Sequence, residues 1–359
     1  MTNKKFLFAC GGTGGHVFPA IAIAESLKKL GVSEISFAGR KDSMESRLVS
    51  PYFEFNEISA VPLHRGAFMS NLSLPFNLAK AVVSAKRVLK KHKPDVVVAT
   101  GGYVSLPIVV AAGLKKIPVY IQEQNAVAGI ANKIGAHSAK MIFVTSKDAV
   151  KFFPNSKTLV FGNPVRELPK MSSLKRPFEF VPGTKSILVV GGSQGARGIN
   201  AKMEASLSAI AGRSDISVVW QAGAKNVEEI QKRVSTPSNV ALRAFLNDIY
   251  SYIAYADIII SRAGASTLAE ILAFGKPSIL LPYPFATANH QEFNARVVEK
   301  AGAALVELDD EPNNLWNKAQ DLLSDENKLN KMADAAKSLG MPDAADQIAK
   351  VIFNAECAK

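Results

Sequence analysis

The chain has 359 residues, of which 48% are hydrophobic and 21% are charged. This length predicts two domains with a core each, and the composition excludes disordered, collagen-like and disulfide-scaffold proteins. The formal net charge of +12 favours an acidic partner, such as nucleic acid, an anionic membrane or an acidic small molecule. Residues 1–165 hold 21 basic and 9 acidic residues and the remainder holds 22 of each, so the whole excess lies in the N-terminal half.

The two cysteines, Cys10 and Cys357, form neither a disulfide framework nor a metal-binding spacing, which favours a reducing compartment. At the N-terminus only residues 6–10 form an apolar run, which is too short for a signal peptide. No stretch approaches the roughly 18 apolar residues of a membrane-spanning helix. We therefore expect a cytoplasmic protein whose membrane contact is peripheral.

Short β-branched runs alternate with longer amphipathic stretches along the first half of the chain. This pattern predicts a parallel α/β sheet with helices on its faces. The expected strands are residues 6–10, 34–38, 95–100, 118–122 and 141–144, and the expected helices are residues 19–30, 78–92 and 148–153.

The pattern weakens over residues 163–185, where four prolines predict a linker, and then restarts. The second set of expected strands is 186–190, 216–221, 240–245, 257–260 and 277–281, with helices at 199–211, 266–274 and 290–301. We predict an α/β protein of two doubly wound, Rossmann-like domains, residues 1–163 and 164–340. A last helix near 343–354, within segment 341–359, is expected to pack onto the first domain.

A glycine-rich turn follows the first strand of each half, at residues 11–15 and 191–195, and a third follows the strand at 95–100. Such a turn exposes backbone N–H groups at the positive end of a helix, which suits phosphate. Neither of the first two has the sequence of a P-loop or of the dinucleotide fingerprint. The pattern favours a ligand in a cleft between the domains, although a tight turn without a ligand is the alternative for each loop.

Three side chains near these turns are candidates for chemistry. His16 lies at a helix start, where imidazolium is disfavoured, so it is a candidate general base or else a capping or packing residue. Arg166 is placed to neutralise a diphosphate, or is a lone surface arginine. Glu270 is placed to accept hydrogen bonds from two sugar hydroxyls, or lies on a solvated helix face. No cluster suggests a metal site, and no cofactor is expected.

Together these motifs resemble the MurG family of bacterial peptidoglycan glycosyltransferases. The resemblance is carried in order by segments 11–20, 101–105, 123–125, 162–166, 191–197, 261–270 and 290–291. It implies the GT-B fold, in which two Rossmann-like domains enclose a cleft. It also implies inverting transfer of GlcNAc from UDP-GlcNAc to the 4-hydroxyl of MurNAc in undecaprenyl-diphospho-MurNAc-pentapeptide, which converts lipid I to lipid II.

The same resemblance implies roles for single residues, with His16 as the candidate base. Glu270 would bind the ribose hydroxyls, Gln291 and Asn125 those of GlcNAc, and Ser193 the diphosphate. The implied UDP-GlcNAc-binding residues are Thr13, Gly14, Gly15, Asn125, Arg166, Ser193, Leu246, Ala265, Ser266, Thr267, Leu268, Ala269, Glu270 and Gln291, and the implied acceptor-binding residues are Gly101, Gly102 and Tyr103.

Two positions depart from patterns common in that family. Gln122 stands where a histidine often precedes Glu-Gln-Asn, and His290 stands where some members have a glutamine before Gln291. His290 is thus a second histidine near the donor, and a base elsewhere, Glu123 included, stays an alternative to His16.

Residues 68–93 combine apolar and basic side chains in a way that suits an anionic lipid surface. The expected membrane patch is Leu72, Phe76, Lys80, Lys86, Arg87 and Lys90, and the alternative is an amphipathic core helix with a solvated face. The resemblance implies a peripheral protein at the cytoplasmic face of the inner membrane, with lipid I and anionic lipid as partners. It also implies work in cell-wall biogenesis, cell shape and division, with proteins of those processes as possible partners.

Other functions compete with this reading. A UDP-sugar transferase acting on a lipid such as diacylglycerol would share the C-terminal motifs, and a hydrolysing UDP-GlcNAc 2-epimerase is a second enzyme alternative. A nucleic-acid-binding protein would explain the charge, but the basic residues lack interleaved base-stacking aromatics or a known binding module. We therefore expect no nucleic acid partner.

Overall fold

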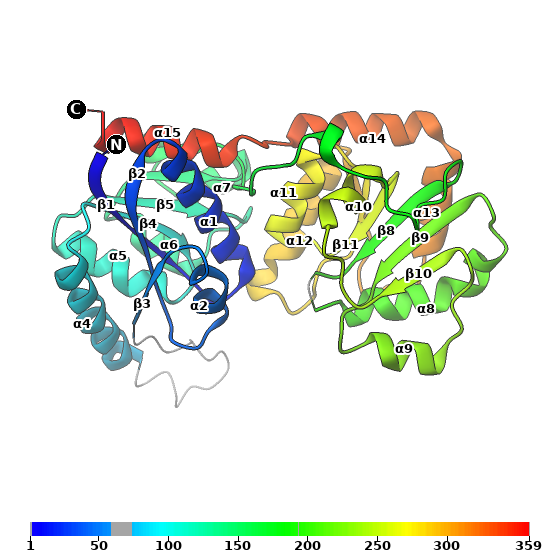
Figure 1. Cartoon of the computed structure of the whole chain (residues 1–359), viewed down its shortest axis with the longest axis horizontal. Coiled ribbons are helices and arrows are strands. Elements are labelled where there is room, and N and C mark those ends of the chain that lie inside the picture. Colours follow the sequence, from blue (N-terminus) through cyan, green and yellow to red (C-terminus); the bar gives the residue numbers. More distant parts are fainter. Residues whose placement is uncertain (1, 59–73, 193, 359) are drawn as a thin grey trace. The chain divides into compact units, whose positions relative to one another are not determined.

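The computed structural model describes residues 2–58, 74–192 and 194–358, and for residues 74–77 it describes the backbone alone. The chain divides into two compact units (Figure 1). Unit 1 comprises Met1–Glu167 and Met341–Lys359, and unit 2 comprises Leu168–Gly340. The division lies a few residues beyond the expected one at 163/164, so Arg166 belongs to unit 1.

Unit 1 is built on a seven-stranded parallel sheet of order β3-β2-β1-β4-β5-β6-β7. Its strands are β1 (Thr2–Cys10), β2 (Val32–Gly39), β3 (Glu54–Glu57), β4 (Val96–Gly101), β5 (Val119–Glu123), β6 (Ala139–Val144) and β7 (Thr158–Val160). Its helices are α1 (Gly14–Lys29), α2 (Met44–Val49), α4 (Leu74–His92), α5 (Ser105–Leu114), α6 (Ile130–Gly135), α7 (Lys147–Val150) and α15 (Ala344–Glu356).

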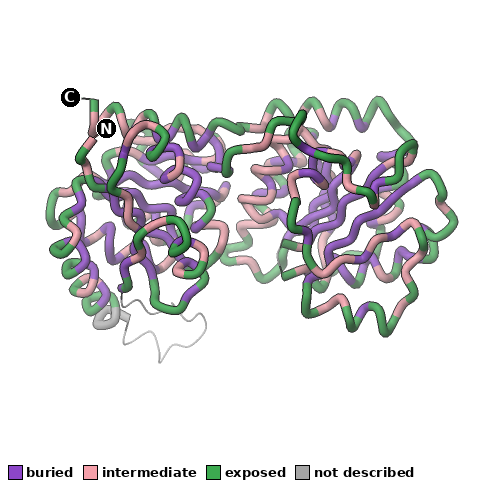
Figure 2. Tube along the Cα trace, viewed as in Figure 1, coloured by how far each residue is buried: buried purple, intermediate pink, exposed green. Residues whose placement is uncertain are grey.

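Helices cover both faces of this sheet because successive side chains of each strand point to opposite sides. On β1, Leu7 and Ala9 pack with residues of α4 and α5, whereas Phe6 and Phe8 pack with residues of α1 and α15. Figure 2 shows the burial concentrated along the strands. A sheet buried on both faces explains why its strands read as continuous apolar runs.

The C-terminal helix α15 lies against α1 in unit 1 and is held by polar contacts as well as apolar ones. Ile348 and Ile352 are fully buried, and Ser26 donates a hydrogen bond to Asp346 at 2.6 Å. Tyr120 of β5 donates to Glu356 at 2.6 Å, and burial together with this carboxylate raises the pKa of the Tyr120 hydroxyl. Residues far apart in the sequence thus complete one core.

Unit 2 has a six-stranded parallel sheet of order β10-β9-β8-β11-β12-β13. Its strands are β8 (Lys185–Val190), β9 (Ile216–Gln221), β10 (Val240–Arg243), β11 (Ile258–Ser261), β12 (Ser278–Leu280) and β13 (Ala304–Val306). Its α-helices are α8 (Arg197–Ala211), α9 (Val227–Arg233), α10 (Ile249–Tyr255), α11 (Ala265–Ala273), α12 (His290–Lys300), α13 (Leu315–Ser324) and α14 (Glu326–Leu339).

The predicted fold class, α/β with two Rossmann-like parallel sheets, is confirmed, and every predicted strand overlaps an observed one. Some predicted bounds are wrong. The first helix begins at Gly14 rather than residue 19, because the extended Thr13 is its N-cap. The strand predicted over 240–245 ends at Arg243, shortly before Asp248 caps α10 through its side chain. The helix predicted over 148–153 ends at Val150.

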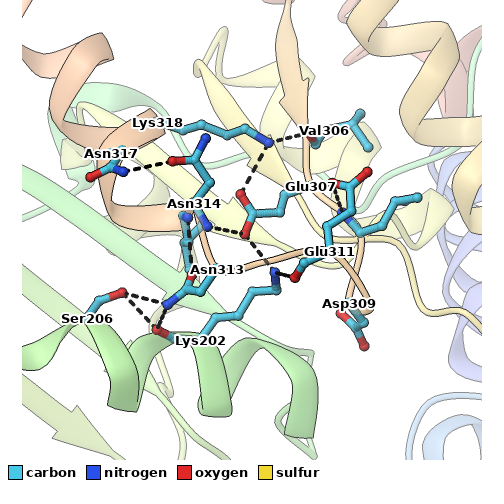
Figure 3. A network of polar contacts seen from close by, with 12 residues as sticks. Lys202, Ser206, Val306, Glu307, Asp309, Glu311, Asn313, Asn314, Asn317 and Lys318 are labelled. Carbon is cyan, nitrogen blue, oxygen red and sulfur yellow. Dashed lines mark hydrogen bonds and ion pairs between the residues drawn. The ribbon is translucent and has the colours of Figure 1, made fainter.

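A buried network of charges joins α8 to the segment after β13 in unit 2 (Figure 3). Glu307 is fully buried, and its Oε1 accepts hydrogen bonds from Lys202 Nζ at 2.8 Å and from the Asn314 N–H at 3.1 Å. Lys318 Nζ lies 3.2 Å from Oε2 of the same carboxylate. Two lysines therefore balance one carboxylate inside the unit.

No helix in the described part of the chain is both long enough and apolar enough to cross a membrane.

Candidate functional site

In each unit the first strand lies at the point where the strand order reverses. β1 lies between β2 and β4, and β8 lies between β9 and β11. Ligands of doubly wound sheets bind outside the carboxyl ends of the strands at this point. The glycine-rich turns follow β1 and β4 in unit 1 and β8 in unit 2, so each unit has a candidate site.

The turns after β1 and β4 touch one another in unit 1. Gly102 has φ of +85°, and a Cβ at this position would overlap the carbonyl oxygen of Gly11. The Tyr103 ring covers Gly12, where a Cβ would lie 3.4 Å from Tyr103 Cε1. Three of the expected site residues, Gly101, Gly102 and Tyr103, are thus brought against the first glycine turn.

Gly102→Ala is expected to destabilise unit 1 by about 3 kcal/mol or more, because a steric overlap with backbone adds to the cost of a positive φ. Gly183→Ala is the matched control, since Gly183 has the same φ of +85° and nothing within 4 Å of the added Cβ. We expect about 1 kcal/mol there. Urea unfolding followed by circular dichroism measures both values, and equal losses would contradict the predicted overlap.

His16 lies in the first turn of α1 and its imidazole is partly buried. Its Nδ1 shares a hydrogen bond with Thr13 Oγ1 at 2.9 Å, whose donor depends on the tautomer. Its carbonyl accepts from Thr100 Oγ1 at 2.7 Å, and a Cβ on Gly101 would lie 2.9 Å from His16 Cδ2. The imidazole is therefore held between Thr13 and the turn after β4.

Glu45, which the sequence did not single out, binds the first glycine-rich turn through its side chain. Its buried carboxylate accepts hydrogen bonds from the Gly12 N–H at 3.4 Å and the Arg40 N–H at 3.2 Å. Burial raises the pKa of the Cys10 thiol, and the nearby Glu45 carboxylate raises it further. The capping box at the start of α2 joins Ser43 and Ser46 and does not include Glu45, so it does not mark this role.

Glu123 is a structural anchor in unit 1. Its buried carboxylate accepts hydrogen bonds from the Gly129 N–H at 2.9 Å, Asn132 Nδ2 at 2.9 Å and both the N–H and Nδ2 of Asn125 at 3.0 and 3.2 Å. Four donors satisfy its oxygens, which disfavours a role as proton acceptor. The same contacts orient Asn125, one of the expected sugar-binding residues.

Gln122, the first of the two unusual positions, lies in a buried chain of amides. Its Nε2 donates to Asn163 Oδ1 at 3.3 Å, and its Oε1 accepts from Gln124 Nε2 at 2.7 Å. Gln124 also donates to the carbonyl of Thr100, the same threonine whose hydroxyl donates to the His16 carbonyl. A side chain at position 122 therefore links the end of β5 to the segment before Arg166.

Arg166 lies over the ring of Phe18 in α1, with 5.7 Å between the guanidinium carbon and the ring centroid. Its neighbour Glu167 pairs with Lys29 at the other end of α1. The structure therefore places Arg166 against the helix that carries His16.

In unit 2 the turn after β8 is held by side chains from β9 and the loop after it. Gln221 Nε2 donates to the Gly192 carbonyl at 2.9 Å, and Asn226 Nδ2 donates to the Gln194 carbonyl at 3.3 Å. These contacts fix the backbone of the turn. Ser193, the expected diphosphate ligand, lies outside the described residues.

The turn after β11 leads into α11, whose first turns hold the expected residues Ala265, Ser266, Thr267, Leu268 and Ala269. Glu270 is half-buried, and its Oε1 accepts a hydrogen bond from the Tyr250 hydroxyl at 3.1 Å. Leu246, expected near uracil, is buried between β10 and α10. These residues lie at the carboxyl side of the same sheet as the turn after β8.

Gln291 lies in the first turn of α12, where its Oε1 accepts a hydrogen bond from the Tyr283 N–H at 3.0 Å. His290 Nδ1 lies 2.7 Å from the Thr287 carbonyl oxygen, and before it Ala288 and Asn289 both have φ of +53°. A left-handed pair of residues other than glycine is costly, and such conformations cluster at ligand sites. The second unusual position, His290, is thus held by its own loop.

Helix α4 fits both interpretations of its sequence. Ala85, Val88 and Leu89 are buried in the unit 1 core, whereas Val83 is 49% exposed. The expected basic residues Lys80, Lys86, Arg87 and Lys90 are all exposed. Of the expected apolar members, Leu72 lies outside the described residues, and the side chain of Phe76 is not described.

Over the described ranges, no cluster of three or more potential metal ligands occurs.

Comparison with known proteins identifies the family of both units. The glycosyltransferase family 28 N-terminal domain matches residues 6–144, and the glycosyltransferase family 28 C-terminal domain matches residues 186–348. Solved structures at 17% identity, such as the UDP-GlcNAc 2-epimerase of Neisseria meningitidis bound to UDP-GlcNAc, share the fold with a TM-score of 0.69 over 97% of this chain and 99% of theirs.

Closer relatives match over nearly their full length. The chain is 43% identical to the UDP-N-acetylglucosamine–N-acetylmuramyl-(pentapeptide) pyrophosphoryl-undecaprenol N-acetylglucosamine transferase of Desulfitobacterium hafniense, over 96% of this chain and 97% of the relative. It is 39% identical to that of Halothermothrix orenii, over 97% and 98%. The crystal structure of Acinetobacter baumannii MurG matches at 30% identity with a TM-score of 0.79, over 98% and 99%. The chain therefore belongs to the MurG family, within glycosyltransferase family 28.

Proposed function

We propose that this protein transfers GlcNAc from UDP-GlcNAc to the 4-hydroxyl of MurNAc in undecaprenyl-diphospho-MurNAc-pentapeptide, with inversion. The observation that carries the proposal is the full-length match to relatives named for this transfer, on a chain whose glycine-rich turns all lie at the switch points of its two sheets. The product is the disaccharide-bearing lipid II of peptidoglycan synthesis.

The donor binds to unit 2 in this proposal. The ribose hydroxyls bind Glu270, the uracil lies by Leu246, and the diphosphate lies at the backbone N–H groups of the turn after β8 and of the start of α11. Gln291 binds hydroxyls of the GlcNAc. Backbone donors of this kind stabilise the negative charge that develops on a leaving diphosphate. Thr13, Gly14, Gly15, Asn125 and Arg166 of unit 1 approach the donor from the acceptor side.

The acceptor binds to unit 1, at the turns that hold Gly102 and Tyr103. His16 takes the proton from the MurNAc 4-hydroxyl as its oxygen forms a bond to C1 of GlcNAc. The bond from C1 to the diphosphate oxygen breaks at the same time, so UDP leaves and the configuration inverts. A single displacement needs a base and a stabilised leaving group but no covalent nucleophile. This fits the structure around Glu123, because hydrogen-bond donors already occupy both oxygens of its carboxylate.

A lipid I analogue offered with a panel of UDP-sugars tests this function, with the disaccharide product identified by mass spectrometry. We expect a GlcNAc-MurNAc product from UDP-GlcNAc, and diacylglycerol as acceptor is expected to yield nothing. Transfer to diacylglycerol would instead support a glycolipid synthase. Release of UDP without any acceptor would support a hydrolysing 2-epimerase, an activity that the shared fold alone leaves open.

The proposed place of work is the cytoplasmic face of the inner membrane, where the lipid-linked acceptor is found. Helix α4 is the proposed contact, because its exposed lysines and arginine are attracted to anionic lipid by roughly 1 kcal/mol each near the surface. Such binding is reversible and weakens with salt. Cell-wall and division proteins are further proposed partners.

Reversing three charges on α4, at Lys86, Arg87 and Lys90, is expected to weaken binding to phosphatidylglycerol vesicles at least tenfold, measured by sedimentation at low salt. The control reverses three exposed lysines of α14, Lys328, Lys331 and Lys337, and so changes the net charge equally. We expect that control to bind almost as the wild type does. Equal losses in both variants would attribute binding to net charge rather than to α4.

A further inference from the structure

A buried arginine next to the proposed donor site has no role in the scheme above. Arg262 directly follows β11 and is only 9% exposed. Its Nη1 donates to the carbonyls of Leu281 and Pro282 at 2.9 and 3.1 Å. Its Nη1 and Nη2 also donate to the two oxygens of Asp309 at 2.6 and 2.8 Å. One guanidinium thus ties together the loops that follow β11, β12 and β13.

The loop after β12 continues directly from these carbonyls to the group that orients Gln291. Pro282 is followed by Tyr283, whose N–H donates to Gln291 Oε1 at 3.0 Å. The Tyr283 ring lies over the Arg262 guanidinium, with 5.7 Å to the ring centroid. Arg262 therefore holds both the backbone and the side chain of the residue that binds Gln291.

Asp309, the partner of Arg262, lies against the helix that follows the turn after β8. A Cβ on Gly198, in the first turn of α8, would overlap the Asp309 carboxylate. Arg262 neutralises this carboxylate through a bidentate ion pair. A lysine presents one ammonium and cannot make the bidentate pair and the two carbonyl bonds with the same geometry.

We propose that Arg262 is a positioning residue for the donor sugar, which acts through Tyr283 on Gln291. The Tyr283 N–H occupies the amide oxygen of Gln291, so the NH2 group of that amide faces the ligand as a hydrogen-bond donor. A fixed donor discriminates between sugars that differ in the direction of one hydroxyl, and a loose one does not. The inference rests on the proposed function, because it takes Gln291 as a ligand of the GlcNAc hydroxyls.

The test compares Arg262→Lys with the wild type for two donors, UDP-GlcNAc and its 4-epimer UDP-GalNAc. The preference, measured as the ratio of the two kcat/KM values, is expected to fall about fivefold to tenfold, which corresponds to one lost hydrogen bond. The Kd of UDP, which lacks the sugar, is expected to stay within twofold. A merely structural arginine would change stability and leave the sugar preference as it is.

Arg213→Lys is the matched control. Arg213 also makes a bidentate pair, with Asp215 at 2.7 Å for both bonds, and its guanidinium carbon lies 6.0 Å from the Trp316 ring centroid. It lies in unit 2 but after α8, so the same substitution is expected to leave the sugar preference unchanged. A fall in both variants would overturn the assignment to Gln291.

A double-mutant cycle with Gln291→Ala tests whether Arg262 acts through Gln291. If Arg262 acts through Gln291, Arg262→Lys lowers the preference no further in a chain that already has Gln291→Ala. Additive losses, or an unchanged preference in Arg262→Lys, would overturn the proposal. If Arg262→Lys does not fold, Asp309→Asn replaces it in the same comparison. A wild type that neither binds UDP-GlcNAc nor transfers GlcNAc would count against the proposed function instead.

Discussion

His16→Ala is expected to lower kcat for transfer by about 10²–10⁴-fold, the range that a positioned general base contributes. The expected Kd for UDP-GlcNAc changes little, because His16 is proposed to contact the acceptor hydroxyl, whereas Glu270, Leu246 and Gln291 of unit 2 are proposed to bind the ribose, uracil and sugar of the donor. Steady-state kinetics with a lipid I analogue measures kcat, and calorimetry with UDP-GlcNAc measures the Kd. The effect is large because the alanine removes the group that accepts the proton in the transition state.

His137→Ala is the control for this variant, since His137 is an exposed histidine of unit 1 whose Nδ1 lies 3.2 Å from the Ile134 carbonyl oxygen. We expect it to keep normal turnover. Near-normal turnover in His16→Ala would move the base elsewhere. Glu123 is then a poor replacement, because four N–H donors already satisfy its carboxylate, and His290 would be the next residue to replace.

Lys202→Met is expected to lower the free energy of unfolding of unit 2 by about 3 kcal/mol or more. Methionine keeps the length of the side chain but leaves Glu307 inside the unit with one of its two lysines, and it also removes the bond to the Glu311 carbonyl. A buried charge that loses its partner is destabilising because no water replaces it. Figure 3 shows Lys202 and Lys318 approaching the Glu307 carboxylate.

Tryptophan fluorescence during urea unfolding measures this loss selectively. The chain has two tryptophans, Trp220 and Trp316, and both lie in unit 2. The control is Lys185→Met, since Lys185 makes an exposed ion pair with Glu326 at 3.8 Å. We expect at most about 1 kcal/mol there. Similar losses in the two variants would mean that the buried ion pair of Lys202 and Glu307 contributes no more to the free energy of unfolding than the exposed pair does.

The strands that the sequence missed share a physical cause. β3, β7 and β13 have three or four residues each. β3 and β7 are the edge strands of the first sheet, and β13 is an edge of the second. An edge strand pairs on one side and is partly exposed, so its sequence carries no long apolar run. The central strands are buried on both faces, and their apolar runs made them predictable.

The candidate site likewise contains residues that the sequence predicted and residues that it did not. The residues at the glycine-rich turns were predictable, because a turn between a strand and a helix needs glycine locally and leaves a recognisable motif. The side chains that hold those turns were not. Glu45 reaches Gly12 across 33 positions, and Arg262 reaches Asp309 across 47. Nothing in the spacing of such residues marks them as partners.

The sequence by itself determined the class of fold, the concentration of basic charge in the first half and the family to which the chain belongs. Each of these depends on local patterns: alternation of strands and helices, composition, and short motifs at turns. Only the tertiary structure decided that Glu123 is saturated by four donors, that Arg166 lies over Phe18, and that Arg262 ties three loops to the backbone that orients Gln291. Those facts depend on which distant residues folding brings within a hydrogen bond of each other, because the energy of a polar side chain is set by its partners and its burial rather than by its neighbours in the chain.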